Sequence, residues 1–133
     1  MPEKRTIERA RRDKREGKAP STQAGEFVKE EIEHVREGKH GARSTKQAIA
    51  IGLSKARRAG VDLPPPPKGR TSERTRKSAE RDRRVGKAGR KRSPSPRRSR
   101  AAEKALRREG HRAASRAALS RHAKSAARRR KAA

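Results

Sequence analysis

An excess of positive charge dominates this sequence and limits the folds open to it. Lys and Arg number 42 against 15 Asp and Glu, which gives a net charge of +27 over 133 residues. Only 27% of the residues are hydrophobic, and Phe27 is the only member of the Phe, Trp and Tyr group. Self-repulsion and chain entropy both oppose compaction when so little apolar surface is available for burial. We therefore expect only part of the length to build a core, and the helix signals described below predict a mainly α-helical chain.

The charge is unevenly distributed along the chain. Residues 1–63 carry 16 basic and 10 acidic side chains, whereas residues 64–133 carry 26 and 5. We divide the chain into a basic N-terminal helix (1–21), a short helical hairpin (22–63), a polyproline linker (64–70) and an Arg/Lys/Ala-rich tail (71–133). The tail has good helix formers but no apolar face, so we predict a largely disordered or loosely helical basic tail that folds on phosphates.

The hairpin has the clearest helical signals. Its first helix is expected over Thr22–Glu37, with one apolar stripe at a period of 3.6 residues formed by Ala24, Phe27, Val28, Ile32 and Val35. A hairpin of two helices of this size has only marginal stability as a monomer. We expect the hairpin to form a homodimer, to recruit residues 1–21 through Ile7, or to be completed by its partner.

The second helix of the hairpin has a start signal and a stop signal. In "STKQ" the Ser44 hydroxyl is expected to cap the Gln47 amide, while the Gln47 side chain reaches back to the Ser44 amide. Gly60 followed by Val61 predicts a Schellman stop in which Val61 packs on Ala56.

No catalytic constellation is recognisable, and we predict a protein that is not an enzyme and uses no cofactor. Glycine-rich phosphate loops and cysteines are absent from the sequence. His34 and His40 lack the i, i+4 spacing of a helical metal pair, so no metal ligation is expected. The glutamates of the first hairpin helix are interpreted as a solvated face, with docking of the basic tail as the alternative; they are Glu26, Glu30, Glu31, Glu33 and Glu37.

The basic clusters carry the functional signal. Arginine outnumbers lysine in them, and its guanidinium suits bidentate phosphate contacts. A structural role competes for the "KARR" cluster at the end of the second hairpin helix, whereas nothing folded is expected to require the later clusters. We predict no catalytic, cofactor-binding or metal-binding residues, and the following nucleic-acid-binding residues: Lys46, Lys55, Arg57, Arg58, Arg90, Lys91, Arg92, Arg97, Arg98, Arg100, Arg107, Arg108, Arg128, Arg129, Arg130 and Lys131.

The segment "STKQAIAIGLSKARRAG", within residues 26–60, resembles a family of small basic bacterial proteins with a domain of unknown function. That family combines a core of this type with a variable Lys/Arg/Ala tail. The resemblance implies a bacterial, cytoplasmic setting and supplies no activity. The longest uncharged run with several large aliphatic residues, "QAIAIGLS", is too short for a membrane span, so no membrane partner is expected.

These features together favour a non-enzymatic, histone-like, nucleoid-associated protein that contacts nucleic-acid phosphates with little sequence specificity. One aromatic residue cannot build a stacking platform, so duplex DNA is favoured and backbone-bound RNA is the second choice. Two alternatives stay open: a protein-interaction adaptor acting through the hairpin, and an RNA- or ribosome-associated factor.

Overall fold

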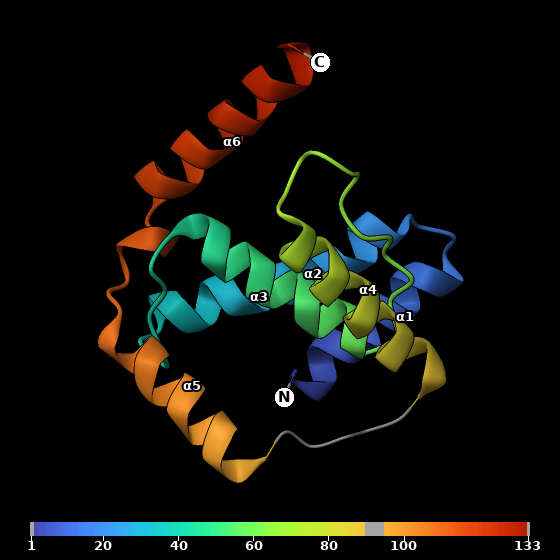
Figure 1. The fold of residues 1–133 in the computed structure, drawn as a ribbon, viewed down its shortest axis with the longest axis horizontal. Coiled ribbons are helices and arrows are strands. Elements are labelled where there is room, and N and C mark those ends of the chain that lie inside the picture. Colours follow the sequence, from blue (N-terminus) through green and yellow to red (C-terminus); the bar gives the residue numbers. More distant parts are fainter. Residues whose placement is uncertain (1, 90–94, 133) are drawn as a thin grey trace. The chain divides into compact units, whose positions relative to one another are not determined.

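Helices make up most of the structure, a computed structural model that describes residues 2–89 and 95–132 (Figure 1). Within those ranges no strand occurs, and one isolated bridge joins Lys68 to Thr71. The mainly α prediction is confirmed. The helices in chain order are α1 (Lys4–Arg15), α2 (Pro20–Arg36), α3 (Thr45–Arg58), α4 (Glu73–Ala88), α5 (Pro96–Arg108) and α6 (Arg116–Ala132), with a 3₁₀ turn at Arg112–Ala114 before α6.

The described residues group into two compact units. Unit 1 comprises those within 1–30 and 51–93, and unit 2 comprises those within 31–50 and 94–133. In the described part of the chain, no helix is both long enough and apolar enough to cross a membrane.

The core of unit 1 joins α1, α2 and α3. Phe27 is 1% exposed and packs with Ala10, Ala24, Ala56 and Val61. Ile7 of α1 packs against this cluster, which confirms one of the three predicted alternatives, recruitment of the first helix through Ile7. Gly52 is needed here, because a Cβ on it would lie 2.7 Å from the Val28 Cα.

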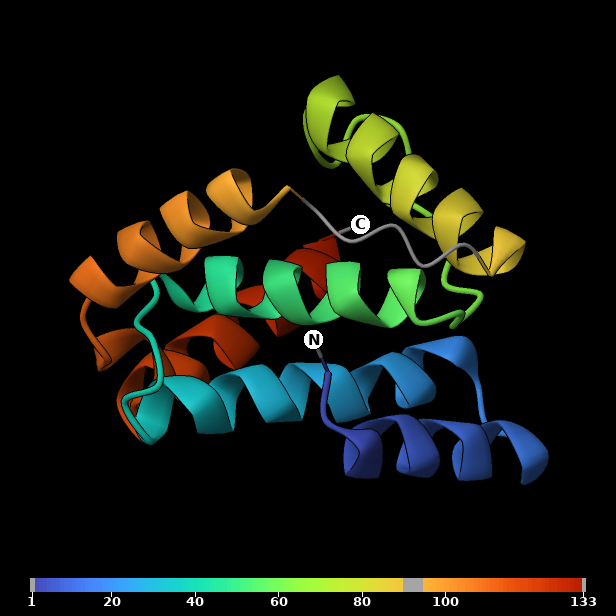
Figure 2. The same cartoon turned by 90° about the horizontal axis from the view of Figure 1, so that it is seen from below.

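The core of unit 2 uses smaller side chains. Val35 packs with Ala42, Ala48, Ala113 and Ala114, and Ile32 lies against this cluster. In unit 1 the first half of α2 meets the second half of α3, and in unit 2 the second half of α2 meets the first half of α3. The predicted hairpin is therefore an antiparallel pair (Figure 2).

The ends of α3 follow the predicted signals with one difference. The Gln47 amide donates to the Ser44 Oγ at 3.1 Å as expected, but the Gln47 Oε1 accepts from the Arg43 amide rather than from that of Ser44. Gly60 has a φ of 105° and the Val61 amide donates to the Ala56 carbonyl at 3.0 Å, which confirms the stop.

The tail was predicted to be largely disordered or loosely helical, and the prediction of disorder was wrong. Residues 73–88, 96–108 and 116–132 form α4, α5 and α6. In unit 1 the Asp82 carboxylate of α4 accepts from the Ser54 hydroxyl and the Arg58 guanidinium, each at 2.8 Å. Backbone contact adds to this, because a Cβ on Gly86 would collide with the Arg57 carbonyl oxygen.

Backbone hydrogen bonds hold the tail of unit 2 in the same way. The Gly41 amide donates to the Leu106 carbonyl at 2.8 Å, and the Ala42 amide donates to the Gly110 carbonyl at 3.0 Å. The prediction failed because it counted large apolar side chains, whereas small residues and polar contacts order these segments.

Candidate nucleic-acid interface

The "KARR" cluster serves the fold of unit 1. Arg57 is 7% exposed, and its guanidinium donates to the Leu63 carbonyl at 3.2 Å and to the Pro64 carbonyl at 3.0 Å. Burial lowers the pKa of the Arg57 guanidinium, and the charge of Asp82 partly opposes that shift. Arg57 therefore secures the turn after α3 and offers little surface to a phosphate.

The two neighbours of Arg57 in this cluster are more accessible. Arg58 keeps 57% of its side chain exposed while it pairs with Asp82 at 2.8 Å. Lys55 is half-buried. In unit 2, Lys46 lies exposed in the first turn of α3.

Helices α5 and α6, both in unit 2, combine many cations with almost no acidic residues. α5 carries six Lys and Arg residues and one acidic residue, Glu103, while α6 carries seven Lys and Arg residues and no acidic residue. Within the described part of the chain, Arg107 is the one member of this set that has an ion pair, with Glu103 at 2.7 Å. The predicted site residues on these helices are all exposed: Arg97, Arg98, Arg100, Arg107, Arg108, Arg128, Arg129, Arg130 and Lys131.

Three predicted site residues, Arg90, Lys91 and Arg92, lie outside the described residues.

Local sequence explains why α5 and α6 begin where they do. The Ser95 hydroxyl accepts from the Arg98 amide at 3.2 Å, and Pro96 occupies the first turn, where its missing N–H costs nothing. The Ser115 hydroxyl accepts from the Ala118 amide at 3.1 Å. These caps stabilise the N-termini of both cation-bearing helices in the free protein.

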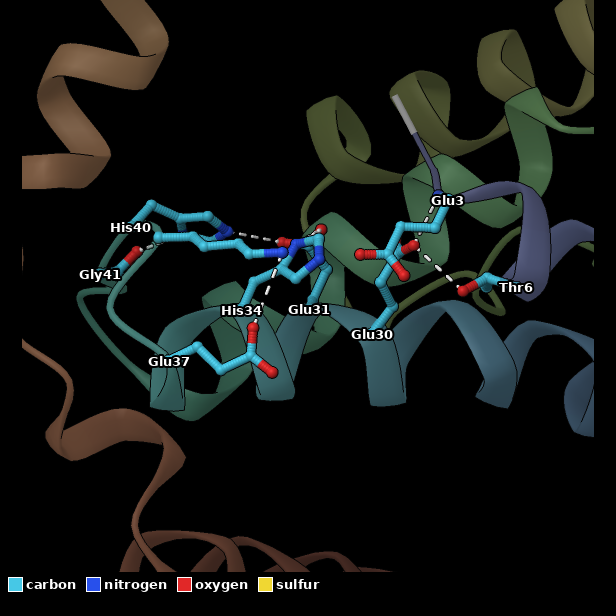
Figure 3. Close-up of polar contacts among 9 residues, drawn as sticks. Glu3, Thr6, Glu30, Glu31, His34, Glu37, His40 and Gly41 are labelled. Carbon is cyan, nitrogen blue, oxygen red and sulfur yellow. Dashed lines mark hydrogen bonds and ion pairs between the residues drawn. The ribbon is translucent and has the colours of Figure 1, made fainter.

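Two glutamates of α2 are buried rather than solvated, which corrects that interpretation for them. In unit 1, Glu30 is 4% exposed, and its Oε1 accepts from the Glu3 amide at 2.6 Å and from the Thr6 hydroxyl at 3.0 Å (Figure 3). This carboxylate lies at the N-terminus of α1, where its negative charge interacts favourably with the helix dipole.

Glu31 belongs to a second polar group, in unit 2. Its side chain is fully buried, its Oε2 lies 3.1 Å from the His40 Nε2, and its Oε1 lies 3.8 Å from the His34 Nδ1 (Figure 3). The two histidine rings meet edge to face with centroids 6.2 Å apart. Sequence analysis missed this group because it tested only the spacing between histidines. The i, i+3 spacing of Glu31 and His34 on one helix is the signal that could have found it.

Comparison with known proteins gives one match. Residues 3–68 match the model of a family of unknown function, DUF6496. No curated protein and no solved structure matches the chain.

Proposed function

We propose that this chain, which matches the DUF6496 family of unknown function over residues 3–68, is a non-enzymatic, histone-like protein that binds nucleic acid. In this proposal the exposed cations of α5 and α6 contact phosphates with little sequence specificity. Duplex DNA is the favoured ligand and the bacterial nucleoid is the setting.

The lack of internal partners on α5 and α6 carries the proposal. Thirteen Lys and Arg residues share these helices with one glutamate, Glu103, which is already paired with Arg107. Such a density of like charge destabilises the compact state through repulsion, and an external polyanion relieves it. When arginines bind the phosphates, the counterions condensed on the nucleic acid are released, and this release contributes a large favourable free energy of binding.

The burial of Phe27 favours duplex over single-stranded nucleic acid as the ligand. Phe27 is 1% exposed inside the core of unit 1, so it offers no face to a nucleobase. Proteins that bind single strands combine a basic groove with exposed aromatic rings on which bases stack. The proposed interface therefore acts on the backbone of the nucleic acid through charge.

The folded state of α5 and α6 bears on how binding occurs. Because both helices are capped and ordered in the free chain, binding has little helix-ordering entropy to offset. The far-ultraviolet circular dichroism of the protein should then change little when duplex DNA is added.

Filter binding over a salt series tests this function. The probes are a duplex DNA of random sequence, a structured RNA and polyphosphate. With six to ten phosphates neutralised, affinity for duplex DNA should fall about 10³–10⁵-fold between 50 and 200 mM salt. Weak binding to both nucleic acids with a shallow salt slope would contradict the proposal and favour the protein-interaction adaptor. A clear preference for RNA would favour the RNA- or ribosome-associated factor.

A further inference from the structure

We propose that Glu31, His34 and His40 form a binding site for one divalent transition-metal ion of the zinc type. The three side chains lie in unit 2, and each offers a ligand atom within 4.8 Å of the others. This site is separate from the proposed nucleic-acid interface and does not depend on it.

The donor set is one that such ions prefer. Two imidazoles and one carboxylate are a common set for Zn²⁺, and they leave a fourth position for water. Glu31 and His34 stand at i and i+3 on α2, the Glu-x-x-His spacing that places both side chains on the inner face of helix-bundle metal sites. His40 approaches from the α2–α3 connection.

The hydrogen bonding of His40 places either a proton or a cation between His40 and Glu31. The His40 Nδ1 lies 2.9 Å from the Gly41 carbonyl oxygen, which can only accept, so Nδ1 carries a proton. In the neutral ring Nε2 is then an acceptor, yet it faces the Glu31 Oε2 at 3.1 Å. Two acceptors at this distance repel each other unless a second proton or a cation lies between them.

Distances and burial fit the metal ion in that role. Ligand atoms about 2.1 Å from a tetrahedral ion lie about 3.4 Å apart. The 3.1 Å separation of the His40 Nε2 and the Glu31 Oε2 and the 3.8 Å separation of the His34 Nδ1 and the Glu31 Oε1 lie on either side of this value, each within about 0.4 Å. The Glu31 side chain is 0% exposed, while those of His34 and His40 are 13% and 14% exposed, so the edge of the group stays open to an entering ion.

The hydrogen bond that His40 makes through its other ring nitrogen also suits a metal. A ligating histidine usually donates its other ring N–H to a carbonyl or carboxylate, as His40 does to Gly41. Lys39, next to His40 in the chain, is the competing cation; its side chain is 54% exposed and pairs with Glu37 at 3.6 Å.

A bound ion would clamp the α2–α3 connection to α2. That connection also donates backbone hydrogen bonds from Gly41 and Ala42 to Leu106 and Gly110. Metal binding should therefore raise the thermal stability of unit 2, because a ligand that binds only the folded state stabilises it.

Titration of the full, tag-free chain tests the site. We expect wild type, freed of metal with a chelator, to bind one Zn²⁺ in calorimetry. With Co²⁺ it should develop the intense visible absorption of a tetrahedral site. His34→Gln and His40→Gln should each weaken binding at least tenfold, and His122→Gln, which lies on α6, should leave it unchanged.

Thermal melts supply a second readout. Zn²⁺ should raise the Tm of wild type and of His122→Gln but not that of His40→Gln, with circular dichroism confirming that each variant is helical. Absence of the tetrahedral Co²⁺ spectrum in wild type would overturn the proposal even if a variant fails to fold. Equal loss of affinity in His122→Gln and His40→Gln would overturn it as well.

Discussion

Helices α4 and α6 carry the same number of cations and differ in what those cations meet. Each has seven Lys and Arg residues, but α4 also has three carboxylates and α6 has none. On α4, Arg76 pairs with Glu73 and Glu80, while Arg83 and Lys87 pair with Asp62. The described residues of α6 form no ion pair. The same number of cations thus meets carboxylates within unit 1 on α4, whereas the described cations of α6 meet none.

The largest expected effect comes from removing three charges from α6. Arg128, Arg129 and Arg130 changed together to Gln should lower the affinity for duplex DNA by about two to three orders of magnitude near 0.1 M salt. The slope of log K against log salt should become shallower by about three, because each lost phosphate contact contributes about one.

The matched control removes the same net charge from α4. Arg76, Arg83 and Lys87 changed together to Gln should lower the affinity far less, since their charges are already neutralised by carboxylates. Filter binding of both triple variants measures the difference. Equal losses would mean that net charge alone decides binding and that the contrast between the helices has no functional meaning.

A glycine substitution probes how α4 is held. Gly86→Ala places a Cβ against the Arg57 carbonyl oxygen, and such a collision should lower the free energy of unfolding by about 1–3 kcal/mol. Gly25→Ala is the control, because nothing lies within 4 Å of its added Cβ in α2; it should stabilise by about 0.5–1 kcal/mol. Urea denaturation measures both variants. An unchanged free energy of unfolding in Gly86→Ala would contradict the close approach of α4 to the Arg57 carbonyl oxygen.

Removing the charge of Asp82 tests the polar anchor of α4. Asp82→Asn weakens the bonds from Ser54 and Arg58 and should cost about 1–2 kcal/mol of unfolding free energy. Glu73→Gln, on the exposed side of α4, should cost roughly 0.5 kcal/mol or less. If urea denaturation gives both variants the same free energy of unfolding, Asp82 does not anchor α4.

The smallest effect is a pH dependence at Asp62. A hydrogen bond from Arg83 holds the pKa of Asp62 below its ordinary value of 3.8, and the charges of Arg83 and Lys87 add to this. A lowered pKa stabilises the fold at pH values above 3.8, and this contribution is lost as the pH falls through the lower, folded-state pKa. Wild type should therefore exceed Asp62→Asn in stability near pH 7, and the difference should shrink below pH 3.8. A gap that stays constant down to pH 2 would contradict the assignment.

Sequence patterns predicted the elements whose signals are local. The 3.6-residue stripe, the Ser44 cap and the Gly60–Val61 stop located the hairpin, because each depends on residues a few positions apart. Docking of α4 was not predictable in this way. It depends on Gly86 and Asp82 meeting partners on α3, and small or polar residues give no periodic apolar signal.

The candidate site residues differ in the same way: some have a local sequence signal, and others depend on contacts between distant parts of the chain. Exposed arginines on α6 were identifiable, because a run of cations without carboxylates is visible in the sequence. The structural role of Arg57 depends on carbonyls beyond the helix end, at Leu63 and Pro64. The burial of Glu31 depends on His40, which reaches it from a connection whose path no local rule fixes.

Residue-resolved chemical modification tests the contrast between paired and unpaired cations most directly. Phenylglyoxal labels accessible arginines, and mass spectrometry reads the rate at each position with and without duplex DNA. We predict that Arg128, Arg129 and Arg130 react quickly in the free chain and are protected by DNA. Arg57 should react slowly in both states. Unchanged rates at the α6 arginines in the presence of saturating DNA would contradict the account.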